Sequence, residues 1–211
     1  MQVTVIDYGI GNLYSVSRAL ERCGGEVTVT ADSVQIEAAS RLVLPGVGAF
    51  ADGMRGLREC GLVEPIKRYA ASGRPLLGIC LGMQMLAGVS EEFGRHEGLD
   101  LIPGRVVPVP QTTTDGQAQK IPHIGWNDLV APRGVDWSDS LLRGTPQGTA
   151  VYLVHSYFVI PDDPRHSLAH CIYGGHRIAA AIRRGRVVGC QFHPEKSGEA
   201  GLAMLAQFLH P

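Results

Sequence analysis

The sequence has few of the features that mark several large classes of protein. Its 211 residues contain no apolar run close to the ~20 residues that cross a membrane, and its net charge of −1 comes without a polybasic segment. Nucleic acid and anionic membranes are therefore poor candidates for its main partner. There is no internal repeat and no low-complexity linker, and the first residues lack the pattern of a secretory signal. We expect one domain over residues 1–211.

Cysteine pairs with metal-site or disulfide spacing are also missing. The five cysteines are an odd number and include no Cys-x-x-Cys pair: Cys23, Cys60, Cys80, Cys171 and Cys190. This pattern favours reduced thiols over a disulfide framework, and it predicts a cytoplasmic protein.

The first half of the chain alternates short apolar strands with helices. Strands are expected at 3–7, 26–30, 41–44 and 75–79, with helices between them and one after the last strand. This order predicts an α/β fold with a mostly parallel central sheet flanked by helices. From residue 104 onward, short segments rich in β-branched residues predict a small, mainly antiparallel sheet. These segments are 106–109, 124–130, 151–154, 168–172, 178–182 and 187–191, and a last helix is expected at 197–209.

One stretch, Leu76-Leu77-Gly78-Ile79-Cys80-Leu81-Gly82-Met83-Gln84, predicts a buried strand, a sharp turn and a helix. Cys80 lies on the turn, and Gly78 and Gly82 flank it where a side chain would collide with crossing backbone. This is the nucleophile-elbow pattern with cysteine in the place of serine. A sulfur at a helix N-terminus is favoured as thiolate, the nucleophilic form. The alternative is a small buried cysteine in a glycine-rich turn.

A partner for this thiol is expected at a second strand end. His193 follows the apolar segment 187–191 directly, and Glu195 comes two residues later. Histidine can accept the thiol proton and return it to a leaving group, and the carboxylate can orient the ring, so the three residues have the roles of a catalytic triad. A zinc site built from Cys80, His193 and Glu195 is a second interpretation, but it lacks the usual ligand spacing.

The N-terminal segment allows a dinucleotide-binding interpretation. Gly9 and Gly11 follow the first strand, and Asp32 lies about twenty residues further on. The third glycine of that fingerprint is replaced by Tyr14, which argues against a dinucleotide cofactor. Two other glycines, Gly46 and Gly48, follow the third strand and allow the backbone to turn its amides toward a ligand at the same sheet edge as Cys80.

Four motifs together resemble the class I glutamine amidotransferases. They occur in the expected order, as Pro45-Gly46-Val47-Gly48, Gly78 to Gln84, His155-Ser156-Tyr157 and Gln191-Phe192-His193-Pro194-Glu195. The resemblance covers nearly the whole chain. Within the class, residues 8–12 and 122–127 look like the glutaminase subunits of imidazole glycerol phosphate synthases, which act in histidine biosynthesis.

The resemblance implies a reaction and its residues. Cys80 would attack the carboxamide of L-glutamine, His193 would carry the proton, and Glu195 would orient His193. The amides of Leu81 and, after a peptide flip, Val47 would bind the oxyanion. The positions that match glutamine-binding residues are Gly46, Gly48, Gln84, Glu92, Ser156 and Tyr157. No cofactor and no metal are implied.

The same resemblance implies a partner, a separate cyclase subunit with a TIM barrel that receives the ammonia. The heterodimer surface would include Asn12, Pro122, His123, Trp126, Tyr152 and Lys196. An exposed Trp126 also makes sense by itself as an interface anchor, whereas the alternative is a tryptophan in the core.

Two competing functions stay open on the sequence. The chain could be the amidotransferase subunit of an anthranilate-type synthase, although residues 125–127 and Met83 argue against it. It could also be a non-catalytic scaffold, which predicts a broken triad, whereas Cys80, His193 and Glu195 are all present.

Overall fold

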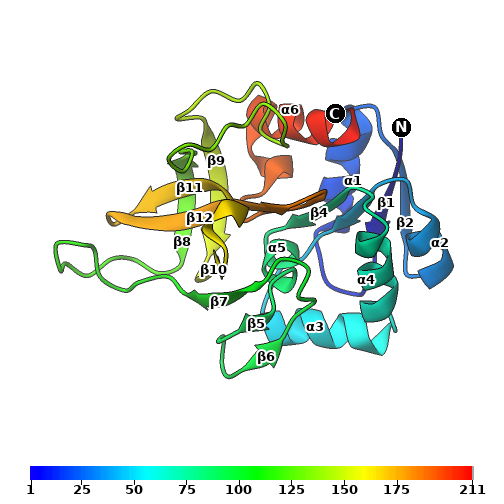
Figure 1. Cartoon of the computed structure of the whole chain (residues 1–211), viewed down its shortest axis with the longest axis horizontal. Coiled ribbons are helices and arrows are strands. Elements are labelled where there is room, and N and C mark those ends of the chain that lie inside the picture. Colours follow the sequence, from blue (N-terminus) through cyan, green and yellow to red (C-terminus); the bar gives the residue numbers. More distant parts are fainter. Residues whose placement is uncertain (211) are drawn as a thin grey trace.

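The computed structural model describes residues 1–210 and shows an α/β fold built on a seven-stranded sheet (Figure 1). The first half of the chain contains β1 (Gln2–Ile6), α1 (Leu13–Arg22), β2 (Glu26–Thr30), α2 (Ser33–Ala38), β3 (Leu42–Leu44), α3 (Phe50–Glu59), α4 (Val63–Ala71), β4 (Leu76–Ile79) and α5 (Leu81–Met85). The second half contains β5 (Val89–Ser90), β6 (His96–Glu97), β7 (Gly104–Pro108), β8 (His123–Asp128), β9 (Ala150–His155), β10 (Tyr157–Pro161), β11 (Ser167–Tyr173), β12 (His176–Arg184), β13 (Val187–Cys190) and α6 (Gly198–Leu209).

The strand order of the large sheet is β11-β12-β13-β4-β3-β1-β2. The five strands from β13 to β2 pair in parallel, in the flavodoxin-like order, while β11 and β12 extend the sheet in antiparallel fashion. The mostly parallel sheet predicted from the sequence is therefore confirmed. In such sheets, ligands bind beyond the carboxyl ends of the strands.

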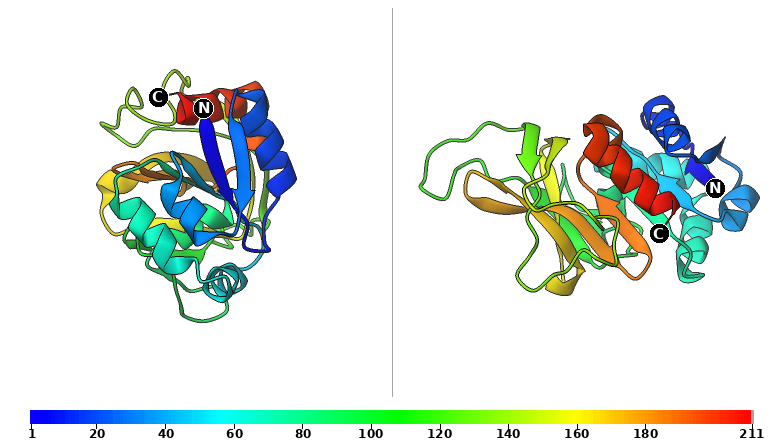
Figure 2. Two further views of the ribbon diagram at one scale, coloured as in Figure 1. Left: turned by 90° about the vertical axis from the view of Figure 1, so that its right-hand side faces the viewer. Right: turned by 90° about the horizontal axis from the view of Figure 1, so that it is seen from above.

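Helices cover both faces of this sheet because its strands are apolar on both sides. On one face, α1 and α6 pack on Val5, Val43 and Leu77. On the other face, α2, α3, α4 and α5 pack on Ile6, Leu42, Leu44 and Leu76. Figure 2 shows these helices gathered at one end of the molecule and the β-rich segments at the other. The two apolar layers hold the strand ends in fixed positions.

The strands of the second half are distributed among the sheets differently from the sequence prediction. A four-stranded sheet (β10-β7-β5-β6) and a two-stranded sheet (β8-β9) form beside the large one, but β11, β12 and β13 belong to the large sheet itself. The small sheet is mainly antiparallel, as expected, with one parallel pair between β5 and β7. No helix among residues 1–210 combines the length and the hydropathy needed to cross a bilayer.

Candidate active site

Cys80 lies on a strained turn between β4 and α5. Its φ of 54° and ψ of −111° lie outside the regions that residues with a side chain usually adopt. A Cβ atom on Gly78 would lie 2.7 Å from the carbonyl oxygen of Gly82, and one on Gly82 would overlap the carbonyl oxygen of Leu44. The predicted nucleophile elbow is therefore present, with both glycines required by close backbone approaches.

The helix after the elbow is shorter than the sequence argument assumed. α5 contains five residues, Leu81–Met85, which is little more than one turn. A helix of this length has a small macrodipole. Stabilisation of a negative charge on the sulfur therefore has to come mainly from the side chains around it.

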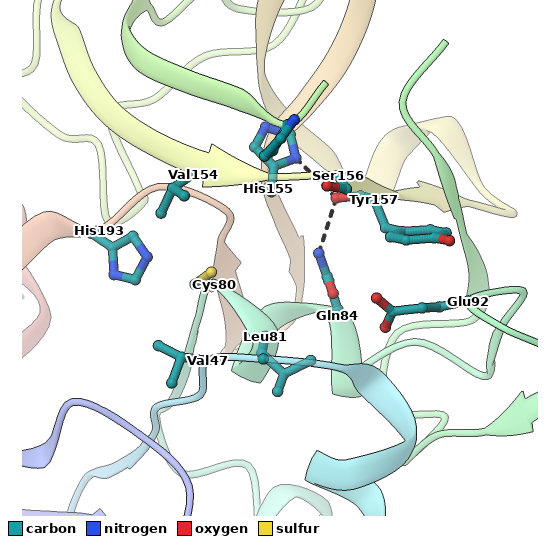
Figure 3. Close-up of a pocket in the computed structure, with 12 residues that line it drawn as sticks. Val47, Cys80, Leu81, Gln84, Glu92, Val154, His155, Ser156, Tyr157 and His193 are labelled. Carbon is teal, nitrogen blue, oxygen red and sulfur yellow. Dashed lines mark hydrogen bonds between the residues drawn. The ribbon is translucent and has the colours of Figure 1, made fainter. Parts of the chain in front are cut away.

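His193 and Glu195 form a buried pair beside the sulfur. Nδ1 of His193 lies 2.8 Å from Oε1 of Glu195, and the two side chains are 3% and 1% exposed. Because Nδ1 is held by the carboxylate, Nε2 is the nitrogen available on the side of Cys80, which the ring faces in Figure 3. Burial lowers the pKa of His193, but the hydrogen bonds and charges of Cys80 and Glu195 outweigh burial and raise the pKa to about 9.

The pairing of two strands brings these distant residues together. β13 and β4 are parallel neighbours, with Cys190 opposite Ile79, and the amide of Cys80 donates to the carbonyl of Cys190 at 2.8 Å. His193 follows β13 at the same edge at which Cys80 follows β4. The thiol, imidazole and carboxylate predicted from the sequence are therefore adjacent, in a row.

This row does not fit the zinc interpretation. Glu195 contacts the nitrogen of the ring that faces away from the sulfur, so the three side chains do not converge on one point. Among residues 1–210, no group of three or more histidine, cysteine, aspartate or glutamate side chains has the arrangement of a metal site. Asp32, the acidic residue of the dinucleotide interpretation, caps α2 instead, with its Oδ1 accepting from the amide of Val34 at 2.8 Å.

The loop after β3 occupies the position where an oxyanion would be stabilised. The amide of Leu81 donates to the carbonyl of Gly46 at 3.3 Å. Because the carbonyl and the N–H of a trans peptide point in opposite directions, the amide of Val47 points away from this position. The hydroxyl of Tyr8 donates to the carbonyl of Pro45 at 2.7 Å and holds the loop from the other side. The two predicted oxyanion donors are thus neighbours, but they are not aimed at one point.

A cavity of about 280 Å³ opens beside the sulfur, a size at the lower end of ligand sites and suited to a small molecule. Most of the residues predicted to bind glutamine line it together with the thiol and imidazole: Val47, Gly48, Cys80, Leu81, Gln84, Glu92, Pro122, Val154, His155, Ser156, Tyr157 and His193 (Figure 3). Gly46 is not among the lining residues, and it contributes through its carbonyl, which accepts from Leu81.

Two polar side chains of this cavity are already held by the protein. One oxygen of Glu92 accepts from the amide of Phe50 at 2.6 Å, at the start of α3. The amide nitrogen of Gln84 donates to the carbonyl of Tyr157 and to Oε1 of Gln191, both at 3.0 Å. Each side chain therefore has a fixed orientation and keeps one further oxygen for a ligand.

A chain of buried histidines connects β8 to the substrate side of the cavity. Nδ1 of His155 donates to the carbonyl of Tyr157 at 2.9 Å, so its Nε2 accepts from Nδ1 of His123 at 3.0 Å. Burial lowers the pKa of His155 to about 4 and lowers that of His123, which keeps both rings neutral. The assignment of His123 to the partner-facing surface is wrong. Its ring is 3% exposed and stacks on Tyr173.

The other residues assigned to the partner surface have at least partial exposure. Trp126 is 59% exposed and meets the ring of Tyr152 edge-on, with 6.0 Å between ring centroids. Lys196 is exposed, while Pro122 is half-buried. Asn12 is half-buried and caps α1, with its Oδ1 accepting from the amide of Ser15 at 3.3 Å. Trp126 is thus a surface residue, and the alternative of a core tryptophan is wrong.

Sequence reasoning missed two buried residues that contact the site, Tyr8 and Gln191. Tyr8 belongs to a motif that carried the resemblance, but nothing in its spacing indicates a bond to Pro45. Gln191 follows Cys190, the last residue of β13, whose carbonyl accepts from the backbone amide of Cys80. Its position beside that residue is a signal that could have identified Gln191 as a neighbour of the thiol.

Comparisons with known proteins agree with this geometry. The family model described as glutamine amidotransferase class-I matches residues 4–211. The imidazole glycerol phosphate synthase subunit HisH 1 of Legionella pneumophila (strain Paris) is 53% identical over 208 residues, which cover 98% of each chain. The HisH subunit of Syntrophotalea carbinolica is 47% identical over 207 residues, again with 98% of each chain covered.

Solved structures with low sequence identity share the fold. The structure titled PurLQS from Thermotoga maritima has a TM-score of 0.71 at 18% identity, and it covers 99% of this chain and 96% of its own. A structure titled glutamine amidotransferase has a TM-score of 0.69 at 18% identity, with 97% and 98% covered. The relatives favour the HisH interpretation over an anthranilate-type subunit or a non-catalytic scaffold. The chain therefore belongs to the class I glutamine amidotransferases and, within this class, to the family of HisH subunits of imidazole glycerol phosphate synthase.

Proposed function

We propose that this chain is the glutaminase subunit of imidazole glycerol phosphate synthase. It hydrolyses L-glutamine and passes the ammonia to a separate cyclase subunit, which forms imidazole glycerol phosphate. The observation that carries the proposal is the row of Cys80, His193 and Glu195, with 2.8 Å between His193 and Glu195. About half of the residues are identical to those of HisH subunits over nearly the full length, which supports the assignment of the reaction.

The reaction proceeds through a thioester. The sulfur of Cys80 attacks the side-chain carboxamide carbon of glutamine, and His193 takes the thiol proton. Collapse of the tetrahedral adduct breaks the C–N bond, and the proton on His193 goes to the departing nitrogen, so that ammonia leaves. Water, deprotonated by His193, then adds to the thioester carbon. Collapse of this second adduct breaks the C–S bond, glutamate leaves, and His193 returns the proton to the sulfur.

Five residues are proposed to hold the substrate. The amide nitrogen of Gln84 is used by the protein, so its oxygen is left to accept from the ligand. Glu92 likewise uses one oxygen on Phe50 and keeps the other for the substrate ammonium group. Gly48, Ser156 and Tyr157 complete the proposed set and line the same cavity.

The oxyanion is proposed to bind to the amides of Leu81 and Val47. In the present arrangement the carbonyl of Gly46 accepts from Leu81, so the Gly46–Val47 peptide has to flip before both amides face the substrate. One donor aimed at an oxyanion is commonly worth about 3–4 kcal/mol. We therefore expect the chain alone to hydrolyse glutamine poorly and the cyclase, with its bound nucleotide, to favour the flipped state.

The partner is proposed to be a TIM-barrel cyclase that docks at the carboxyl edge of the sheet. Free ammonia in water would mostly be protonated and unreactive, so it has to pass directly between the subunits. The exposed ring of Trp126, supported by Tyr152, is the proposed anchor, with Asn12, Pro122 and Lys196 around it. The five free cysteines favour a reducing compartment, and we propose the cytoplasm.

The test compares glutamine with ammonia as nitrogen donors. The variant Cys80→Ala, mixed with the cyclase, is expected to lose glutamine-dependent formation of imidazole glycerol phosphate and to keep the ammonia-dependent reaction. Loss of both reactions would show that Cys80 serves assembly instead of chemistry. Failure of the unmodified pair to use glutamine would contradict the proposed function itself.

A further inference from the structure

Gln191 lies between the proposed nucleophile and the proposed substrate-binding residues. Its side chain has no exposed surface. Its amide nitrogen lies 3.8 Å from the sulfur of Cys80, within hydrogen-bond range for a sulfur acceptor, and its Oε1 lies 3.0 Å from the amide nitrogen of Gln84. One buried amide therefore contacts the thiol with one end and a ligand-facing side chain with the other.

The carbonyl of Tyr157 determines the orientation of the Gln191 side-chain amide. The carbonyl of Tyr157 can only accept, so the group of Gln84 that lies 3.0 Å from it has to be the nitrogen. The same nitrogen faces Gln191, which has to present its oxygen there. The other end of the Gln191 side chain, the NH₂ group, is then the one that faces Cys80. The donor to the sulfur is thus determined by the hydrogen-bond network.

Strand pairing places Gln191 at this position. Gln191 comes directly after Cys190, whose carbonyl accepts from the backbone amide of Cys80. The backbone amide of Gln191 donates to the carbonyl of Ala180 at 2.8 Å. Gln191 and His193 are two residues apart, just beyond the end of β13, and the side chains of both reach the sulfur of Cys80. The sulfur therefore has two polar neighbours from one segment, an imidazole and an amide.

We propose that Gln191 is a positioning residue for Cys80: its amide N–H donates to the sulfur, stabilises the thiolate and holds it toward the substrate carbon. An N–H donor to an anionic sulfur is a charge-assisted hydrogen bond, which is stronger than one to a neutral thiol. The short helix α5 contributes little to the same task. The link to Gln84 also joins the position of the sulfur to the side chain that is proposed to bind glutamine. This inference rests on the proposed function, because it assigns Cys80 as the nucleophile.

Two substitutions that nearly conserve the size of the side chain distinguish a positioning role of Gln191 from a role in core packing alone. Gln191→Glu keeps an acceptor for Gln84 but presents a carboxylate oxygen to the sulfur in place of a donor. Gln191→Met keeps the volume and removes both hydrogen bonds. The readout is the pH dependence of Cys80 alkylation by iodoacetamide in the full-length chain, followed by mass spectrometry of the Cys80 peptide. The exposed thiol of Cys60 in the same sample is the internal control.

We expect both variants to shift the midpoint of Cys80 alkylation to higher pH, by about one pH unit for Gln191→Met and by more for Gln191→Glu. A shift of one unit means about tenfold less thiolate at a given pH below the midpoint. The profile of Cys60 should not move. With the cyclase present, kcat for glutamine should fall more than KM rises.

A purely structural role predicts lower melting temperatures for both variants with an unchanged alkylation midpoint at Cys80, and this result would overturn the inference. An equal midpoint shift for Cys60 would also overturn it, since the effect would then be general. Alkylation reads the sulfur without glutamine. The inference on Gln191 can therefore fail while the unmodified pair still uses glutamine, and the two failures are distinguishable.

Discussion

Two neighbours on opposite sides of the imidazole ring determine the pKa of His193. Glu195 holds Nδ1 at 2.8 Å, and Cys80 lies on the other side of the ring. Burial opposes the charged form, but these neighbours prevail and raise the pKa of His193 from 6.5 to about 9. Since the pKa is raised on folding, protonation of His193 stabilises the folded chain. That contribution is complete below about pH 6.5, and it is lost as the pH rises through about 9.

The variant Glu195→Gln tests this linkage. Removing the carboxylate charge lowers the pKa of His193, so the variant should be less stable than the unmodified chain by about 2 kcal/mol at pH 6. The difference should shrink steadily toward pH 9. Chemical denaturation at several pH values measures it.

The exposed Glu91 provides a matched control, because Glu91→Gln removes the same charge from the surface. Its stability difference should stay near zero over the same range. A difference for Glu195→Gln that is independent of pH would contradict the proposed ion pair.

At the scale of elements, the loop from Pro45 to Gly48 is held at two points. The hydroxyl of Tyr8 donates to Pro45, and the carbonyl of Gly46 accepts from Leu81. Burial raises the pKa of Tyr8 far above its ordinary value, so the hydroxyl remains a donor at every physiological pH. Both hydrogen bonds favour the arrangement in which the backbone amide of Val47 points away from the oxyanion position.

The variant Tyr8→Phe should loosen this loop. It removes one hydrogen bond worth about 1 kcal/mol, which corresponds to about a fivefold increase in the flipped population if that bond is absent from the flipped state. Glutamate release by the isolated chain should rise by up to the same factor, in an assay without cyclase.

Tyr14, a 77% exposed residue of α1, supplies the control. Tyr14→Phe should leave glutamate release unchanged. If Tyr8→Phe lowers release instead, the Tyr8 bond supports the productive arrangement, and the interpretation of the loop is wrong.

The elements themselves differ in how far the sequence predicts them. β1 and β4 are short, mainly apolar strands, each followed by a helix, so both their existence and their place in a parallel sheet could be predicted. β5 and β6 have two residues each, too few for any periodicity. Only Ser156 lies between the end of β9 and the start of β10, so no turn signal separates them. β12 joins the large sheet by pairing with β13, and β11 joins it by pairing with β12, and no local pattern reports such pairing.

Some features of the site could likewise be predicted from the sequence, and others could not. Cys80 and His193 could be predicted to meet because each directly follows a buried strand, and the ends of parallel strands share an edge. The bond from Leu81 to Gly46 joins two backbone groups and leaves no trace in residue types. The burial of His123 depends on Tyr173, a residue fifty positions further on, which stacks on its ring.

At the scale of the whole molecule, the two-stranded sheet of β8 and β9 carries both a surface and a connection. Its aromatic pair consists of the exposed Trp126 and the half-buried Tyr152. From the same strands, His123 and His155 lead through hydrogen bonds to Tyr157 at the cavity. The proposed partner surface and the proposed substrate site are therefore joined by neutral, buried side chains.

Trp126→Ala should weaken association with the cyclase by at least about tenfold, since central aromatic anchors contribute most of the energy of an interface. Because the ring is 59% exposed in the free chain, the melting temperature should change little. Isothermal titration calorimetry with purified cyclase measures the affinity.

Val34, which is 72% exposed on α2, offers a comparison site. Val34→Ala should leave the affinity unchanged. Equal affinities for Trp126→Ala and the unmodified chain would remove Trp126 from the interface.

The contact between the amide of Leu81 and the carbonyl of Gly46 has a consequence for the supply of the two gene products. Under the proposed function, a copy of this chain that is synthesised in excess of its cyclase keeps that contact and hydrolyses glutamine poorly. Surplus molecules would then consume little glutamine, so unequal expression of the proposed pair would release little ammonia that nothing captures.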